Sequence, residues 1–198
     1  LGDYTLTLRY ADPGVTSLDG ISATAASGVP TQGAIPSANT GQTITLQGAG
    51  FDSATRVVFT TFDGDSPQNG LGALSVTPAS VAPDGLSLTV VVPATAVTGV
   101  VRIGDEPGGL ILQIVPTLSD VDLTSGSWGD GSSVTLLGSG FVEGAQTILL
   151  GTAIGAGGAT EVEDLWDGVG PNAYRAYIMG QYRDNTALSF QVPAEAPT

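Results

Sequence analysis

The chain lacks cysteine, histidine and lysine, so five arginines are the only basic side chains among its 198 residues. Without cysteine the protein can form no disulfide, thiolate nucleophile or thiolate metal site. Without histidine it lacks the usual acid–base group of neutral pH, and a Ser-His-Asp triad is excluded. Without lysine it can form no Schiff base. Two-carboxylate glycoside hydrolysis needs none of these residues, and its candidate carboxylates are Glu161, Glu163, Asp164 and Asp167, for which a solvated loop is the favoured interpretation. We predict that the protein is not an enzyme and needs no organic cofactor.

Positive charge is scarce overall, since 19 acidic residues give a net charge of −14 and a pI near 4.1. An acidic surface repels the phosphate backbone, which argues against a nucleic-acid partner. No apolar run reaches the roughly 18 residues of a membrane span, which argues against membrane insertion. Acidic surfaces also keep secreted proteins soluble and attract divalent cations. The composition is thus compatible with an extracellular or cell-surface protein.

Helical patterns are scarce too, whereas 29 glycines and 12 prolines suit a protein of strands and turns. Apolar and polar residues alternate with the period of two that is typical of half-buried strands. Residues 160–168 are expected to form a loop with a short helix. The segments rich in Val, Ile, Leu and Thr are predicted as strands, namely 17–25, 43–48, 56–62, 86–93, 99–104 and 110–115.

The chain contains an internal repeat. The sequence of residues 41–51, GQTITLQGAGF, matches GSSVTLLGSGF at residues 131–141. Further on, LSLTVVVPATA at residues 86–96 matches ALSFQVPAEA at residues 187–196. In the first motif, two glycines permit a sharp bend at the end of a strand and the phenylalanine closes the end of a core. In the second, proline ends a strand because it cannot donate to the ladder.

A Gly-x-Gly-Phe motif followed by a strand ending in Val-Pro resembles the IPT/TIG family of immunoglobulin-like domains. The resemblance covers most of the chain twice and implies an all-β protein of two tandem immunoglobulin-like antiparallel β-sandwiches, each of about seven short strands. It implies no catalytic residues. The expected divisions are an N-terminal strand at 1–16, a first domain at 17–116, and a second domain at 117–198 with an insert at about 155–185.

The second copy is expected to need a closing strand. In the first copy two strands follow Val-Pro-Ala, whereas the second copy has only a few residues after this motif. At the other end of the chain, an alternating strand places Tyr4, Leu6, Leu8 and Tyr10 on one face. This strand would complete the second domain of a neighbouring unit by β-strand complementation. Two alternatives stay open: the chain is one segment of a longer repeat protein, or residues 1–10 fold back onto the same chain.

The predicted function is that of a structural subunit or repeat unit of an extracellular filament or fibrous cell-surface protein. Copies of the chain would be the partners, joined head to tail, because a heterologous contact that does not close makes a fibre. The alternative is an adhesive or glycan-binding module, or a spacer, of a larger secreted protein. An accessory domain of a secreted hydrolase is a third interpretation.

Two pairs of carboxylates are candidate calcium ligands, because hard oxygen atoms are the ligands that calcium prefers. Asp63 and Asp65 form one pair, and Asp120 and Asp122 form the other. Neither segment matches a complete calcium-binding loop, and turns favour aspartate for conformational reasons alone. Calcium is the ion we expect if these pairs bind one, and solvated turn carboxylates are the alternative.

The insert in the second copy carries several aromatic residues, which anchor protein or sugar partners when they lie on loops. The same side chains could instead cap the core of the enlarged second domain, and the sequence does not decide between a glycan or host-surface contact and such a cap. The candidate partner-binding residues are Trp166, Tyr174, Tyr177 and Tyr182.

Overall fold

The computed structural model describes residues 16–62, 71–123, 132–141, 147–150, 160–163 and 187–192. Within these ranges the regular structure consists of β-strands without any helix, and the strands form several sheets that are antiparallel apart from one pair. The all-β class predicted from the alternating pattern is therefore confirmed. No helix in this part of the chain is long and apolar enough to cross a membrane.

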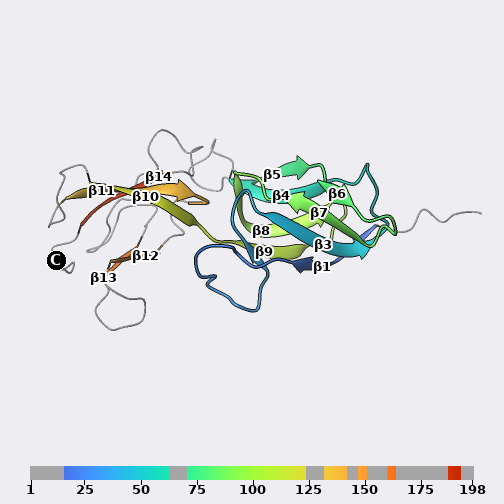
Figure 1. The fold of residues 1–198 in the computed structure, drawn as a ribbon, viewed down its shortest axis with the longest axis horizontal. Helices are drawn as coiled ribbons and strands as arrows, with labels where there is room; N and C mark the ends of the chain where they lie inside the picture. Colours follow the sequence, from blue (N-terminus) through green and yellow to red (C-terminus); the bar gives the residue numbers. More distant parts are fainter. Residues whose placement is uncertain are drawn as a thin grey trace, which may run out of the picture.

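The first unit, residues 16–115, contains two sheets that form two layers (Figure 1). A four-stranded sheet has the order β1-β3-β7-β6, and a five-stranded sheet has the order β2-β9-β8-β4-β5, in which β2 pairs with β9 in parallel. The strands are β1 (Ser17–Ser22), β2 (Ser37–Ala38), β3 (Thr43–Ala49), β4 (Val57–Phe62), β5 (Leu71–Val76), β6 (Ser80–Val81), β7 (Ser87–Val91), β8 (Ala96–Ile103) and β9 (Leu110–Ile114).

One hydrophobic core joins the two sheets of the first unit. Alternate residues of β3 and β7 point into it, and the intervening residues of β3 are exposed or half-buried. This is the pattern that the period of two predicts for a sheet with one covered face. The largest fully buried side chains of this core are Phe59, Ile44, Leu46, Leu88 and Leu112, which come from both sheets.

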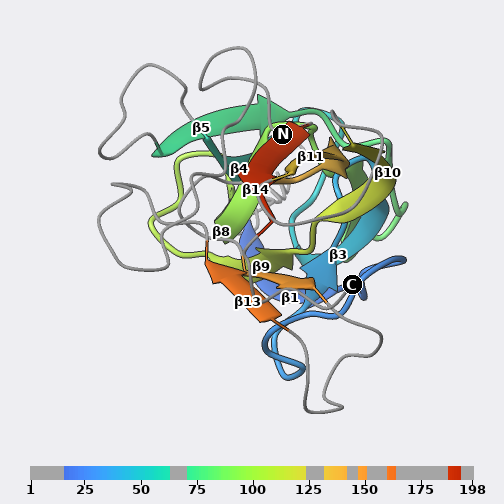
Figure 2. The same ribbon diagram turned by 90° about the vertical axis from the view of Figure 1, so that its left-hand side faces the viewer.

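The second unit, residues 117–192, shows a three-stranded sheet with the order β10-β11-β14 and a separate hairpin of β12 and β13. Both views place the hairpin apart from the three-stranded sheet (Figures 1 and 2). The strands are β10 (Thr117–Leu123), β11 (Ser133–Ser139), β12 (Thr147–Leu150), β13 (Thr160–Glu163) and β14 (Ala187–Gln191). Since residues 160–163 form β13, the expectation of a short helix is wrong there: pairing with β12 decides the conformation, and the β-branched Thr160 and Val162 suit a strand.

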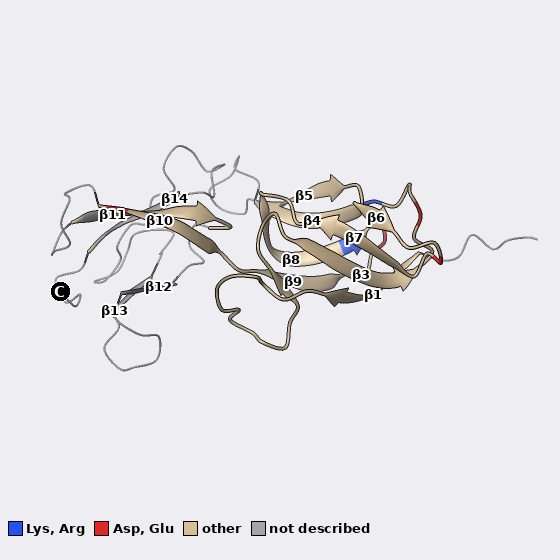
Figure 3. Ribbon diagram, viewed as in Figure 1, with Lys and Arg blue, Asp and Glu red and all other residues tan. Residues whose placement is uncertain are grey.

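The two units follow each other along the long axis of the molecule, with only Val115 and Pro116 between β9 and β10 (Figure 1). Charged residues of the described chain are few, and several acidic ones lie at the end of the first unit that is remote from the second (Figure 3). The broad faces of the sheets are therefore largely uncharged.

Candidate functional site

The sheet of the second unit repeats that of the first, strand by strand and in register. β1 pairs with β3 from Ser17 opposite Ala49, and β10 pairs with β11 from Thr117 opposite Ser139. Each pair carries a β-bulge at the same place, between Leu18 and Gly20 in the first unit and one hundred residues later in the second. An identical irregularity in both units identifies β10 as the counterpart of β1, and β11 as that of β3.

The third strand of each sheet also corresponds. In the first unit the Val92 amide donates to the Gln42 carbonyl oxygen at 2.9 Å, and in the second the Val192 amide donates to the Ser132 carbonyl oxygen at 2.9 Å. These partners differ by 90 positions on one strand and 100 on the other, as in the sequence repeat. β14 is therefore the counterpart of β7. The hairpin β12–β13 likewise corresponds to β4–β5, because β12 begins 90 residues after β4.

The repeated glycines and phenylalanine have a shared physical cause. Gly48 and Gly138 lie directly against the carbonyl oxygen of the first residue of β1 and of β10, so a Cβ at either position would overlap that atom. The ring that closes the core lies beside each glycine, with Phe51 4% exposed and Phe141 5% exposed. The prediction that the aromatic residue closes the end of a core is confirmed in the first unit, where Phe51 belongs to the core.

The two sheets differ in how well their inner faces are covered. Leu18 and Ile21 on β1 are partly buried and pack against the core of the first unit. Their counterparts on β10 are Leu118, which is 57% exposed, and Val121, which is 44% exposed. The repeat places large apolar side chains at equivalent positions, but only those of the first unit are covered.

The difference in exposure has a structural explanation. In the first unit β1 packs against β8 and β9 of the opposite sheet, and β4 pairs with β8 on one side and β5 on the other. Among the described residues of the second unit, no strand is the counterpart of β8 or β9, and β12 pairs only with β13. Within the part of the chain that the structure describes, nothing takes the place beside β12 that β8 has beside β4, and Leu118 and Val121 of β10 are exposed.

A chain of hydroxyl groups connects the two units directly. Thr40, in the turn before β3, donates a hydrogen bond to Ser139 Oγ at 2.7 Å, and Ser139 Oγ lies 2.6 Å from Thr117 Oγ1. Gly140 follows Ser139 with φ of 75°, and a Cβ added to it would be in van der Waals contact with Ile114 and Pro116. The second unit therefore contacts the first through the end at which β10 begins and β11 ends.

The linker between the units is fixed by a buried amide. Asn39 is 5% exposed, and its Nδ2 donates to the Val115 carbonyl oxygen at 2.8 Å and to the Ser27 carbonyl oxygen at 2.9 Å. Its Oδ1 accepts from the Ser27 amide at 2.9 Å. The Val115 amide in turn donates to the Ala38 carbonyl oxygen at 2.9 Å. Both backbone polar groups of Val115, the residue before Pro116, are therefore hydrogen-bonded to the first unit.

The predicted strand residues Tyr4, Leu6, Leu8 and Tyr10 lie outside the described residues, so their role stays a prediction. The same holds for Asp63 and Asp65, and for the aromatic candidates Trp166, Tyr174, Tyr177 and Tyr182.

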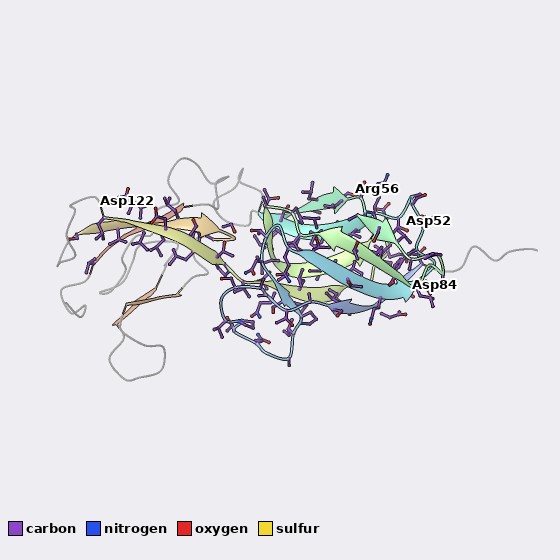
Figure 4. All side chains as sticks on the ribbon, viewed as in Figure 1. Asp52, Arg56, Asp84 and Asp122 are labelled. Carbon is purple, nitrogen blue, oxygen red and sulfur yellow. The ribbon has the colours of Figure 1, made fainter. Side chains whose placement is uncertain are left out.

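The structure does describe Asp120 and Asp122. They lie two residues apart on β10 and are exposed, and Figure 4 labels Asp122. Asp120 accepts a hydrogen bond from the next amide, of Val121, at 2.8 Å. The described residues contain no cluster of three or more potential metal ligands. Two carboxylates fall short of the six to eight oxygen atoms that calcium takes.

Neither the exposed residues of β10 nor the residues at the junction stand out in the alternating pattern of the sequence. Leu118 and Val121 could have been found by extending the repeat to its first strand, since SLDGI at 17–21 matches TLSDV at 117–121. Asn39 and Thr40 carry no such signal, because their partners are distant in the sequence.

No family model, curated protein or solved structure matches this chain.

Proposed function

We propose that this protein is a structural subunit or repeat unit of an extracellular filament or fibrous cell-surface protein, joined head to tail by β-strand complementation. In this proposal each unit is an immunoglobulin-like sandwich of the IPT/TIG type, and the second is closed by a strand from the next copy. The extracellular setting rests on the acidic composition and on the resemblance of the repeated motifs to that family.

The observation that carries the proposal is the uncovered inner face of β10. In the second unit Leu118 and Val121 are exposed. In the first unit the equivalent residues, Leu18 and Ile21, pack against the core, and their strand contacts β8 and β9. An added strand needs side-chain burial, which an exposed apolar face such as that of β10 supplies, and backbone hydrogen bonds, which a strand edge supplies. A strand beside β12 would take the place that β8 has beside β4.

The N-terminal strand has the composition that this site requires. Tyr4, Leu6, Leu8 and Tyr10 alternate with Thr5, Thr7 and Arg9, so one face is apolar and the other polar. Fully burying an apolar side chain of this size contributes about 1.5–3 kcal/mol. Because the donor strand comes from one end of a chain and the acceptor is at the other, the contact propagates without closing.

The proposal is tested by removing residues 1–10 and returning them as a peptide. The truncated protein is expected to remain folded in its first unit and to stop assembling, as measured by sedimentation and electron microscopy. A peptide of residues 1–16 should bind it and reduce the binding of a hydrophobic dye to the second unit.

A matched pair of peptides identifies the face that binds. Leu6→Asp places a charge on the apolar face and is expected to abolish binding, whereas Thr7→Asp places it on the polar face and should bind nearly as well as the native peptide. If the truncated protein assembles like the full chain, or if both altered peptides bind equally, strand complementation by residues 1–10 is refuted.

A further inference from the structure

The glycine before the phenylalanine of each repeat motif has the same backbone conformation in both units but differs in solvent exposure. Gly50 has φ of 71° and Gly140 has φ of 75°, and each directly precedes the phenylalanine of its motif. Gly50 is exposed, whereas Gly140 is buried. The local fold is therefore the same, and the difference in burial comes from what lies against it.

The first unit and the linker together cover Gly140. A Cβ built on Gly140 would lie 3.4 Å from Ile114 Cγ2, 3.5 Å from Pro116 Cα and 3.7 Å from Thr40 Cγ2. The end of the second unit that carries Gly140 is thus seated on the preceding unit. The corresponding end of the first unit consists of Ser17, Ala49 and Gly50, of which Gly50 is exposed and the other two are half-buried; we call this end the open pole.

We propose that the open pole is a contact surface for a second copy of this chain, whose second unit seats on it as the first unit seats on Gly140. The inference rests on the proposed head-to-tail assembly and adds a second contact to it. The occupant follows from continuity with the contact inside the chain: in that contact the end equivalent to the open pole faces the preceding unit.

The position of the pole in the sequence strengthens the inference. Only residues 11–16 separate the proposed donor strand from Ser17. A donor strand seated in a neighbouring copy would therefore hold the open pole close to that copy at a high effective concentration. Under this condition a small contact suffices to fix the orientation of successive chains.

The open pole differs chemically from its counterpart in two ways. Ala49 stands where the second unit has Ser139, so the hydroxyl bridge to Thr40 has no equivalent there. Asp52 and Asp84 lie at the same end of the first unit (Figure 4). Since the chain carries a net charge of −14, the contact between copies is expected to strengthen when salt screens these carboxylates.

The test uses the full chain with Ala49→Gln, which adds an uncharged side chain to the open pole. The control is Ala73→Gln, the same change at an exposed position of β5. A second variant, Gly50→Asn, adds a side chain that tolerates positive φ better than most. Thermal unfolding verifies that each variant is folded, and sedimentation gives the concentration at which filaments form.

Ala49→Gln and Gly50→Asn are expected to raise the critical concentration for assembly about tenfold, the change that a loss of about 1.4 kcal/mol causes. Ala73→Gln should leave it unchanged, and the variants should still donate their N-terminal strand to chains that lack residues 1–10. If both pole variants assemble like the native chain while the truncated chain does not, the pole contact is refuted and strand complementation stands. If the truncated chain assembles normally, both proposals fail.

Discussion

The amide of Asn39 gives the sharpest prediction for stability, because it connects its own turn and the segment of Ser27 to the linker. Asn39→Ala removes two hydrogen bonds to Ser27 and one to the Val115 carbonyl oxygen. Each hydrogen bond contributes about 0.5–1.5 kcal/mol net, and a buried carbonyl group that loses its partner costs about 1–3 kcal/mol. Together these effects predict that the free energy of unfolding falls by about 3 kcal/mol.

For a unit of this size, 1 kcal/mol corresponds to a shift of roughly 4–8 °C in Tm, so the first unit should melt about 12–24 °C lower. The measurement is thermal or urea unfolding followed by NMR signals of β3 and β7, which report the first unit alone. Gln47→Ala is the control, since it removes an amide from an exposed position of β3 and should change stability by less than about 0.5 kcal/mol. Equal melting of the two variants would show that the amide contacts do not stabilise the unit as argued.

Two further predictions concern the glycine motif and the junction. Gly48→Ala should destabilise the first unit by at least about 1–3 kcal/mol in urea unfolding, because the added Cβ would overlap a carbonyl oxygen of β1. Gly33→Ala is the control and should be nearly neutral, because a Cβ added there has no atom within 4 Å. Ser139→Ala should cost only about 1 kcal/mol in unfolding free energy but widen the range of orientations between the units, as measured by residual dipolar couplings; couplings that still fit one fixed orientation would refute a role for the hydroxyl bridge.

Much of the first unit could be predicted from its sequence because its strands alternate clearly. The expected segments 43–48, 56–62 and 110–115 each coincide with a strand in the structure, and the motifs of the internal repeat, each expected to end a strand, lie at the ends of β11 and β14. The signal is strong where one face of a strand is buried and the other is solvated, since the burial pattern is then written directly into the residues.

The short strands β2 and β6 have no comparable signal. Each is two residues long and is fixed by its neighbour, β9 or β7, rather than by its own composition. β10 shows no alternation of its own either, because its residues TLSDVDL are nearly all exposed, and only the match of TLSDV with SLDGI of β1 indicates a strand there. Tertiary pairing decides these segments, so local patterns could not reveal them.

The candidate site lay largely beyond sequence reasoning for the same physical reason. Whether a face is open depends on the other segments that pack against it, and the residues of the strand itself do not reveal this. Leu118 looks like a core leucine in the sequence, and only the comparison with the partly buried Leu18 shows that it is exposed. The repeat makes this comparison meaningful, since it supplies a covered reference for each uncovered position. Without the first unit as a reference, the exposed residues of β10 would read as ordinary surface residues.

The same comparison predicts how the second unit could be closed within one chain. Moving residues 1–16 from the N-terminus to a position after Thr198, through a short flexible linker, offers the donor strand to the second unit of its own chain. This variant should remain monomeric, and its second unit should melt higher because Leu118 and Val121 become covered. Leu118 is 57% exposed and Val121 is 44% exposed, so together they expose about as much as one fully exposed side chain. Burying one such side chain contributes about 1.5–3 kcal/mol, which is the expected gain in the unfolding free energy of the second unit. The same rearrangement with Leu6→Asp is the control, and equal melting of the two proteins would mean that the strand does not occupy the open face.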